Sequence, residues 1–483
     1  MKLRRCVRLT VLRLTATWLT SIALTACVSV PNTAVRESRL RPEDLGLTGA
    51  TTAAFSDSWW QAYGDPQLDA LIEQALHGSP TLAAVLARLH QAQAGLAASH
   101  AASYPQISAA ANEQRQRLSG SYIIPPPYGG STQWLGTVQA NLEWSLDFWG
   151  RQSAQVALAR SSLEAAALDA NAARLAVSAA VTRAYIDLAR AYTLRDLAVE
   201  TITQRADILA LTNTRVRNGL ESGAAQKNAE ALLALARMDR VRADADVELA
   251  GHQVAALIGR GAEAYATFTP PQLNPDAIAL PRVLPADLLA RRADVQAARA
   301  RIDAALSARA VVRARFYPNI NLAAFAGWSA IGLGAMFEAP ARTYGVGPAI
   351  NLPIFDAGLL RAQYAGATAS LDAAVVDYNG AVIEAVRQTA DALTQLRALG
   401  EQSSEQRVAL DAARQSFQLA QTRYHNGLTT QLSVLDAEST LLQARTRAAT
   451  LSADVASRRV ALLAAVGGGF DLGTPQPIQE IPQ

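Results

Sequence analysis

The sequence has few of the residues on which catalytic and metal sites are built. Its 483 residues include only two cysteines and five histidines. The zinc-protease pattern H-E-x-x-H, a phosphate-binding loop and the nucleophile elbow of hydrolases are all missing. We therefore expect no enzyme, no catalytic residue, no metal and no cofactor. The histidines are scattered along the chain: His77, His90, His100, His252 and His425.

Proline and glycine are missing between Arg151 and Asn218. A continuous helix over that stretch extends roughly 100 Å, which is typical of a coiled coil. The returning stretch, about Ala224 to Ile258, supplies a seam in which alanine recurs at Ala229, Ala236, Ala243 and Ala250. Aromatic residues make up only 6% of the chain, which also favours closely packed helices over a thick globular core.

The chain is internally duplicated. Thr214-Arg-Val-Arg-Asn218-Gly219-Leu220 returns as Thr422-Arg-Tyr-His-Asn426-Gly427-Leu428, at an offset of 208 residues (422 − 214). The same offset joins Gly150 to Gly358 and Gly259 to Gly467, which indicates a duplicated structural unit. Asn and Gly tolerate the left-handed conformation at a helix end. Each copy therefore predicts the tip of a long helical hairpin.

A period of two replaces the helical pattern in two segments, each opened by Tyr-Pro. In the first, about 104–146, apolar and polar residues alternate up to Leu146. The second, about 317–354, contains two such runs. A polar face that includes Glu143 suits a membrane strand beside a wet lumen better than a core strand. We predict four membrane strands per chain, with Leu142 and Val346 facing lipid and Asn141 and Asn351 facing the other side.

Four strands cannot close a membrane barrel, since the smallest known barrels have eight. An open sheet edge cannot lie in lipid either, because each unpaired backbone group costs several kcal/mol. The chain is therefore expected to oligomerise. Two copies supply eight strands and a filled interior, whereas three supply twelve and leave room for a pore.

The first 26 residues have the pattern of an export signal. Five cationic residues precede an apolar stretch that ends in Leu24-Thr-Ala-Cys27. This ending resembles the lipobox of bacterial lipoproteins, so Cys27 is expected to carry lipid; the alternative is an ordinary secretory signal with an incidental cysteine. Val28, in place of Asp, implies the outer membrane. Without the signal the formal charge changes from +3 to −2, which removes support for nucleic-acid binding.

Together these motifs resemble the TolC superfamily, and more narrowly its NodT-like branch of lipoprotein outer-membrane factors. The resemblance covers nearly the whole mature chain. One departure is Ala293, where relatives usually have Pro, and it concerns only a helix start. The motifs are Leu24-Thr-Ala-Cys27, Trp59-Trp60, Tyr63-Gly-Asp-Pro66, Asp147-Phe-Trp-Gly-Arg151, Leu289-Ala-Arg-Arg-Ala-Asp-Val295, Phe316-Tyr-Pro-Asn-Ile320 and the two Asn-Gly-Leu tips.

The resemblance implies a mainly α fold with a membrane β part. In it, a homotrimer forms a twelve-strand outer-membrane barrel, four strands per chain, on a long periplasmic α-helical coiled-coil barrel. Such a channel passively passes drugs or toxic organic compounds from an inner-membrane pump, often of the resistance-nodulation-division type, and a periplasmic adaptor. Its other partner is outer-membrane lipid. A TolC-like channel for protein secretion and a structural periplasmic coiled-coil lipoprotein are the alternatives; the lipobox argues against the first and the alternating strands against the second.

The expected organisation is two repeats between terminal extensions. The first repeat, 58–261, has strands about 104–146 and a hairpin about 151–258. The second, 286–468, has strands about 317–354 and a hairpin about 359–466. The other segments are the signal 1–26, the lipid tether 27–57, a Pro-rich linker 262–285 in which the prolines prevent a helix, and the tail 469–483.

The hairpin tips are the first candidate site. As the most distal points of the two hairpins, they are where an adaptor meeting the channel end-on makes contact. The alternative is that they are only helix turns. The residues are Asn218, Gly219, Leu220, Asn426, Gly427 and Leu428.

Asp436 is the second candidate, for the periplasmic aperture. In TolC-like channels a matching position of the second copy carries an aspartate that rings the constriction, whereas the first copy here has Asn228. Arg423 and Tyr424, across the same turn, are the expected hydrogen-bond donors. Ser433 stands where some relatives have a second acid. The alternative is an acid that only caps a helix start, favoured by the helix dipole.

Overall fold

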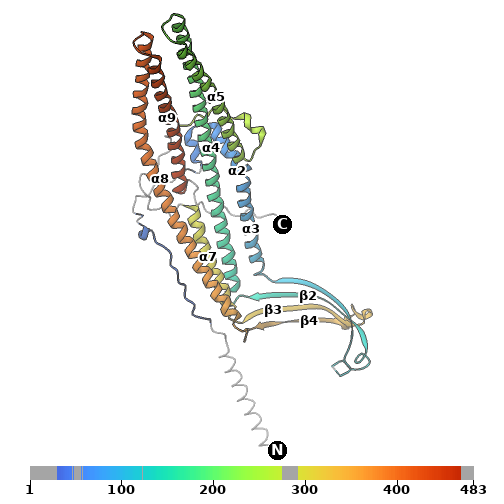
Figure 1. Cartoon of the computed structure of the whole chain (residues 1–483). Helices are drawn as coiled ribbons and strands as arrows, with labels where there is room; N and C mark the ends of the chain where they lie inside the picture. The colour runs from blue at the N-terminus through green and yellow to red at the C-terminus, as the bar shows by residue number, and fades with distance from the viewer. Residues whose placement is uncertain are drawn as a thin grey trace, which may run out of the picture. The chain divides into compact units, whose positions relative to one another are not determined.

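The computed structural model describes residues 30–45, 47, 56, 58–121, 123–274 and 292–468 (Figure 1). The signal, Cys27, part of the tether, the end of the linker and the tail lie outside these residues. The chain divides into two compact units. Unit 1 contains Met1–Arg39, His90–Ala165 and Ala298–Tyr378, and unit 2 contains Leu40–Leu89, Ala166–Ala297 and Asn379–Gln483. Both units therefore draw on both repeats.

The four long helices keep the offset of 208 at every end. Helix α4 spans Arg151–Arg217 and α5 spans Gly223–Leu257. In the second repeat, α8 spans Leu359–His425 and α9 spans Gln431–Ala465. The predicted pair of long helical hairpins is confirmed, because the same proline-free stretches and the same Asn-Gly interruptions set the bounds in each copy.

Shorter helices complete the chain. Helices α2 (Pro66–Gly78) and α3 (Pro80–Ala101) precede the first strands, and α7 (Ala293–Ala314) precedes the third. One expectation was wrong: the segment 262–285 was predicted to lack helix, but Ala262–Thr267 forms a short 3-10 helix, η3. The physical reason is that its first proline is Pro270, so nothing prevents a helical turn before it. The remaining short 3-10 helices are Pro42–Leu45, Trp59–Tyr63, Leu333–Ala335 and Ala339–Ala341.

The largest apolar core of unit 2 surrounds the Trp59-Trp60 pair. Both indoles and Tyr63 are buried, and they pack with residues of α2, α4, α5 and α9. Asp65 caps α2 by accepting from the Gln67 amide, and its other oxygen accepts from the hydroxyl of Tyr185 in α4 at 2.7 Å. Burial and the hydrogen bond to Asp65 raise the pKa of Tyr185 above its usual value. The Tyr63-Gly-Asp-Pro66 motif therefore stabilises the packing of α2 against α4.

Unit 1 contains a four-stranded antiparallel sheet in the order β1-β2-β3-β4. The strands are β1 (Gln106–Arg117), β2 (Thr132–Leu146), β3 (Asn319–Ile331) and β4 (Arg342–Asn351). All four predicted strands are therefore present. At one end each strand adjoins α3, α4, α7 or α8 in sequence, and at the other are the β1–β2 and β3–β4 loops. We name these the helix end and the loop end of the sheet.

Candidate functional site

The two faces of the sheet differ in chemistry toward the helix end. The register aligns Ile107, Leu142, Ala324 and Val346 in one row, so these side chains share a face. Ile107 and Val346 are about three-quarters exposed within the single chain, at 75% and 77%. Such exposed aliphatic side chains in a regular sheet are typical of a surface that lies against lipid.

The opposite face is polar and internally hydrogen-bonded. The Gln139 amide donates to Asn141 at 2.7 Å, and Asn319 donates to Asn321 at 3.1 Å. Ser145 of β2 donates to Asn319 of β3 at 3.3 Å. Amide and hydroxyl groups of this kind are suited to contact with water, so the sheet separates an apolar side from a wet side. The predicted separation of Leu142 and Val346 from Asn141 and Asn351 onto opposite faces is confirmed.

The outer strands of the sheet leave their edges open. Strand β1 pairs only with β2, and β4 pairs only with β3, among the residues that the structure describes. The backbone N–H and C=O groups on the free sides of β1 and β4 need partners before the sheet can lie in lipid. One chain is therefore an incomplete membrane element.

Arginine on the apolar face is expected to prevent membrane insertion. Leu142→Arg or Val346→Arg places a charge against lipid and costs about 2–4 kcal/mol near the bilayer midplane. The matched variant Asn141→Arg places the same side chain on the wet face, where we expect a smaller effect. The amount of heat-modifiable oligomer in outer-membrane fractions measures insertion. Equal losses for Leu142→Arg and Asn141→Arg contradict the assignment of faces.

The hairpin tips are tight turns that depend on glycine. Gly219 has φ of 68° and Gly427 has φ of 73°, in the left-handed region. The Leu220 amide donates to the Arg215 carbonyl at 2.9 Å, and the Leu428 amide donates to the Arg423 carbonyl at 2.8 Å. These bonds cap α4 and α8 in the same manner. The turns leave the leucines exposed, at 64% and 68%.

Beside the tips, polar side chains of α4 contact α8 and α9. The corresponding pairs of residues are not both repeated in the other copy. Arg215 lies 4.7 Å from the ring centre of Tyr424 and donates to its carbonyl oxygen at 3.2 Å. Gln431 donates to Thr212 at 2.9 Å, and both side chains are buried. At the offset of 208, Arg215 corresponds to Arg423, Tyr424 to Val216, and Gln431 to Gly223. The sequence does not reveal these contacts, because the partners are 209 and 219 positions apart.

A buried ion pair lies further along the same helices. Arg205 of α4 approaches Glu438 of α9 at 3.4 Å, with side chains 15% and 1% exposed. The guanidinium also donates to the Leu232 carbonyl of α5 at 2.8 Å. Burial raises the pKa of Glu438, and the attraction of Arg205 lowers it only in part. Arg205 therefore favours the charged form of a carboxyl group that burial disfavours.

Removing Arg205 is expected to destabilise unit 2 in a pH-dependent way. Arg205→Met leaves a buried carboxylate without a cation, at a cost of about 3–5 kcal/mol at neutral pH. The folded pKa of Glu438 then lies still further above its unfolded value, so protonation stabilises the fold and the deficit shrinks as pH falls toward 5. Thermal unfolding at pH 5 and pH 8 measures this.

Two further variants serve as controls for that measurement. Arg205→Met combined with Glu438→Leu removes both charges and should regain most of the stability. Arg414→Met disrupts an exposed pair with Asp411 (3.5 Å) and should cost less than about 1 kcal/mol. A pH-independent loss in Arg205→Met would contradict the role assigned to Glu438.

The structure places the three aperture candidates apart within one chain. Asp436 lies exposed in the second turn of α9, and no described side chain donates to its carboxylate. Arg423 is exposed. Tyr424 is 1% exposed in an apolar cluster with Phe417 and Val434, and its hydroxyl has no hydrogen-bond partner among the described residues. Neither expected donor is joined to Asp436 in the single chain, because Tyr424 occupies the helix seam.

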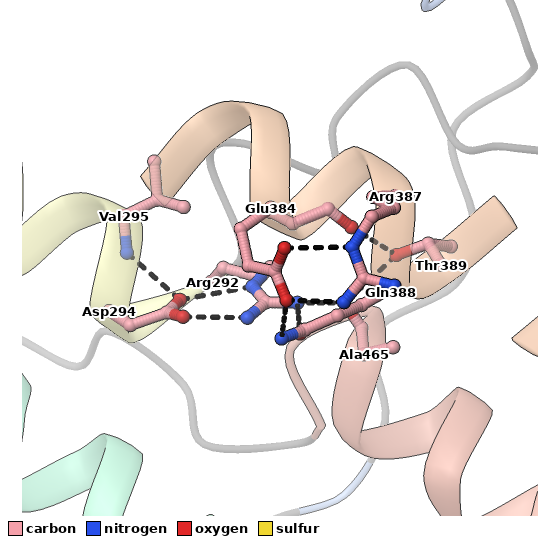
Figure 2. Close-up of polar contacts among 9 residues, drawn as sticks. Arg292, Asp294, Val295, Glu384, Arg387, Gln388, Thr389 and Ala465 are labelled. Carbon is pink, nitrogen blue, oxygen red and sulfur yellow. Dashed lines mark hydrogen bonds and ion pairs between the residues drawn. The ribbon is translucent and has the colours of Figure 1, made fainter. Parts of the chain in front are cut away.

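Arg292, from the Leu289–Val295 motif, joins three helices (Figure 2). Its guanidinium donates to both carboxylate oxygens of Asp294, at 3.0 and 2.6 Å, to Gln388 of α8 at 2.9 Å, and to the Ala465 carbonyl at 3.0 Å. It thereby caps the C-terminus of α9 at the start of α7. Residues 289–291 of the motif lie outside the described residues.

An exposed salt-bridge cluster on α8 lies next to Arg292 (Figure 2). Arg387 contacts Glu384 and Asp391, each at 2.5 Å, and its hydrogen bonds lower the pKa of Glu384 to about 2. Gln388 donates to the same glutamate at 2.9 Å. The hydrogen bond to Glu384 orients Gln388, whose side-chain oxygen accepts from Arg292.

Residues 30–39 of the tether, which belong to unit 1, are bound to α7 and α8 of that unit. The amides of Arg36 and Glu37 donate to Asp372 of α8 at 2.9 and 3.2 Å. Arg309 of α7 donates to the Thr33 carbonyl at 2.8 Å. Val30 packs against Phe316, Leu360 and Tyr364. This part of the tether therefore follows a defined path to the helix end of the sheet.

Groups of three or more metal-ligating side chains do not occur among the described residues. Likewise, none of the described helices combines the length and the hydropathy that a membrane span requires.

A model of the outer membrane efflux protein family matches residues 71–260 and 284–468. The chain belongs to this family. The two matches correspond to the two repeats, and family membership makes the sheet the membrane part of an outer-membrane efflux channel whose helices extend into the periplasm. The interpretation of the sequence as a TolC-like channel protein of the outer membrane is therefore confirmed.

Curated relatives agree with the family. The chain is 35% identical to the fusaric acid resistance protein FusA of Burkholderia cepacia over 363 residues, covering 73% of this chain and 68% of FusA. It is 29% identical to the multidrug resistance outer membrane protein MdtP of Escherichia coli K12 over 463 residues, covering 93% and 95%.

Solved channels share the fold. The outer membrane protein VceC of Vibrio cholerae is 34% identical, with a TM-score of 0.79 over 86% of this chain and 100% of VceC. The outer-membrane channel OprN is 26% identical, with a TM-score of 0.78 over 92% of this chain and 99% of OprN.

Proposed function

We propose that this protein is the exit duct of a tripartite efflux pump, in which three copies form one passive channel. The observation that carries this proposal is the four-stranded sheet with one apolar face, one polar face and two open edges. Three copies supply twelve strands, which close the edges and leave an aqueous pore lined by the polar faces. Two copies give eight strands, whose interior side chains fill the barrel.

The cargo we propose is small, toxic organic molecules, including drugs. FusA is named for resistance to fusaric acid and MdtP for resistance to multiple drugs. The chain carries no phosphate-binding motif, so energy for transport comes from an inner-membrane pump, for which the resistance-nodulation-division type is our proposal. A periplasmic adaptor connects pump and duct. We propose no catalytic activity and no cofactor beyond a covalent lipid.

The proposal is tested by stoichiometry and export together. Native mass spectrometry of the protein in detergent is expected to show a trimer. Expression with its neighbouring pump and adaptor genes in a strain without its own outer-membrane factor should lower drug accumulation. A folded monomer with full strand content, or a channel that restores protein secretion but no drug export, overturns the proposal.

The exposed tip leucines are proposed to contact the adaptor. Leu220→Ser combined with Leu428→Ser removes apolar contact area without altering the glycine turns, so export and tip–adaptor crosslinking should fall while the trimer persists. Gly219→Val and Gly427→Val should do the same through strain of about 1–3 kcal/mol at positive φ. Gly332→Val is the control. Gly332 also has a positive φ, of 86°, but it lies in the β3–β4 loop and not at a hairpin tip. Normal export with normal crosslinking argues that the tips are only turns.

A lipid on Cys27 is proposed as a second membrane anchor. The described chain begins three residues later, where Val30 packs beside Phe316 near the helix end of the sheet. Mass spectrometry of the mature protein is expected to show an N-terminal, acylated Cys27. Cys27→Ser should weaken membrane retention yet leave export measurable, because the strands also hold the membrane. A mature N-terminus elsewhere, or an unmodified Cys27, refutes the anchor.

Asp436 is proposed to line the periplasmic aperture. Threefold symmetry brings three carboxylates around one axis, where mutual repulsion favours cations and opposes closure. Asp436→Asn should reduce cation selectivity or divalent block in single-channel recordings, with little change in trimer stability. Asn228→Asp adds an acid at the equivalent position of the first repeat and should strengthen both effects. Asp436 does not cap α9, because the N-cap is Thr430 and the first turn contains no acid. If Asp436→Asn lowers only the melting temperature, the residue stabilises the helix and does not line the aperture.

A further inference from the structure

Charged side chains on the apolar face of the sheet are confined to the loop end. The register places Arg115 opposite Trp134 and Arg342 opposite Trp328, on the same face as Leu142 and Val346. Arg117 follows Arg115 by two residues and therefore shares its face. We name Arg115, Arg117 and Arg342 the loop-end arginines. Toward the helix end, the same face carries Ile107, Leu142, Trp144, Leu146, Ile320, Leu322, Val346 and Ile350.

The loop-end arginines are exposed and are flanked by tryptophan. All three are exposed in the chain, and no described carboxylate forms a salt bridge with any of them. The Arg115 guanidinium lies 5.9 Å from the ring centre of Trp134. Trp328 packs edge-on against Phe337 of the β3–β4 loop, with ring centres 5.8 Å apart. Aromatic side chains of this kind mark the level of the lipid headgroups in membrane barrels.

The position of the arginines along the strands fits that level. Arg342 begins β4, a strand of 10 residues, and Arg115 and Arg117 are among the last residues of β1, a strand of 12. A tilted strand of about 9–11 residues crosses the hydrocarbon layer. The arginines therefore lie where hydrocarbon ends on the side opposite the helices. Since the helices of this family are periplasmic, that side is the outer leaflet.

We propose that the loop-end arginines bind the phosphates of lipopolysaccharide, the phosphorylated glycolipid of the outer leaflet. Guanidinium groups bind phosphate oxygens through paired, charge-assisted hydrogen bonds. The acyl chains of the same molecule cover the apolar residues between the arginines and the helix end. Arginine on a lipid-facing surface is unfavourable in hydrocarbon, whereas at the headgroup level it meets an anion.

Acidic side chains near the arginines leave an excess of positive charge. Glu113 lies on the same face of β1, and Glu338 lies in the β3–β4 loop. Neither forms a salt bridge with a loop-end arginine among the described residues. Three arginines against two acids leave one positive charge per chain. Glu113 supplies an internal control, because its removal should not weaken the binding of an anion.

The test uses the assembled channel and defined lipids. Native mass spectrometry of the detergent-purified protein is titrated with bisphosphorylated lipid A, monophosphoryl lipid A, phosphatidylglycerol and phosphatidylcholine. We expect the tightest binding for bisphosphorylated lipid A. Arg115→Gln, Arg117→Gln and Arg342→Gln together should weaken that binding by about tenfold or more, since each replacement removes charge-assisted hydrogen bonds to phosphate. Glu113→Gln should bind at least as tightly as the unmodified protein.

Several outcomes overturn the proposal. One is that the triple glutamine variant binds bisphosphorylated lipid A as tightly as the unmodified protein does. Another is that the unmodified protein binds phosphatidylcholine as tightly as bisphosphorylated lipid A. Tighter binding of phosphatidylglycerol indicates an unspecific anion surface and also refutes the assignment. The single variants and a triple replacement by lysine, which retains the charge, keep the test decisive if the triple glutamine variant does not assemble. Export activity is measured separately, so its loss cannot be mistaken for loss of lipid binding.

Discussion

Backbone hydrogen bonding in lipid is the constraint on which the rest of this structure depends. A sheet with two free edges cannot remain in hydrocarbon, where no water satisfies its backbone groups. The sheet order β1-β2-β3-β4 therefore requires further copies of the chain. The alternation of side chains then separates a lipid surface from a wet surface. A channel follows from the sheet without any special pore-forming motif.

The repeats explain how one chain presents two different helix seams. Where Glu200 of α4 bonds Arg445 of α9 at 2.7 Å, the second repeat has Val408 on α8, which is 67% exposed. Where Arg205 bonds Glu438, the second repeat has Ala413. Polar pairs thus supplement the apolar seam inside the chain. Outside the seam, α5 and α8 expose apolar side chains: Leu235, Met238, Val241, Val408 and Leu419. Apolar faces of this kind suit helices of a neighbouring copy.

Periodicity and repeat arithmetic predicted the elements well, because both are local properties of the sequence. Helix α8 begins at Leu359, where the second hairpin was predicted to begin, and ends at His425, directly before the Asn426-Gly427 tip. Contacts between distant segments were not accessible in this way: Arg205 and Glu438 are 233 positions apart, and nothing near either residue identifies the other. The repeat did contain one unused signal, since one partner of each such pair differs between the copies: Arg205 is replaced by Ala413 and Glu200 by Val408.

Tyr424 shows why proximity in sequence misled the prediction about the aperture. Near the turn, it was expected to donate to Asp436, but it belongs to the seven-residue row Leu410, Phe417, Tyr424 that packs in the seam. The helix period decides which way a side chain points, whatever function its neighbours have. Asp436, outside that row, remains exposed. An aperture built from Asp436 must therefore take its partners from another copy of the chain or from water, so its state depends on how the copies are assembled.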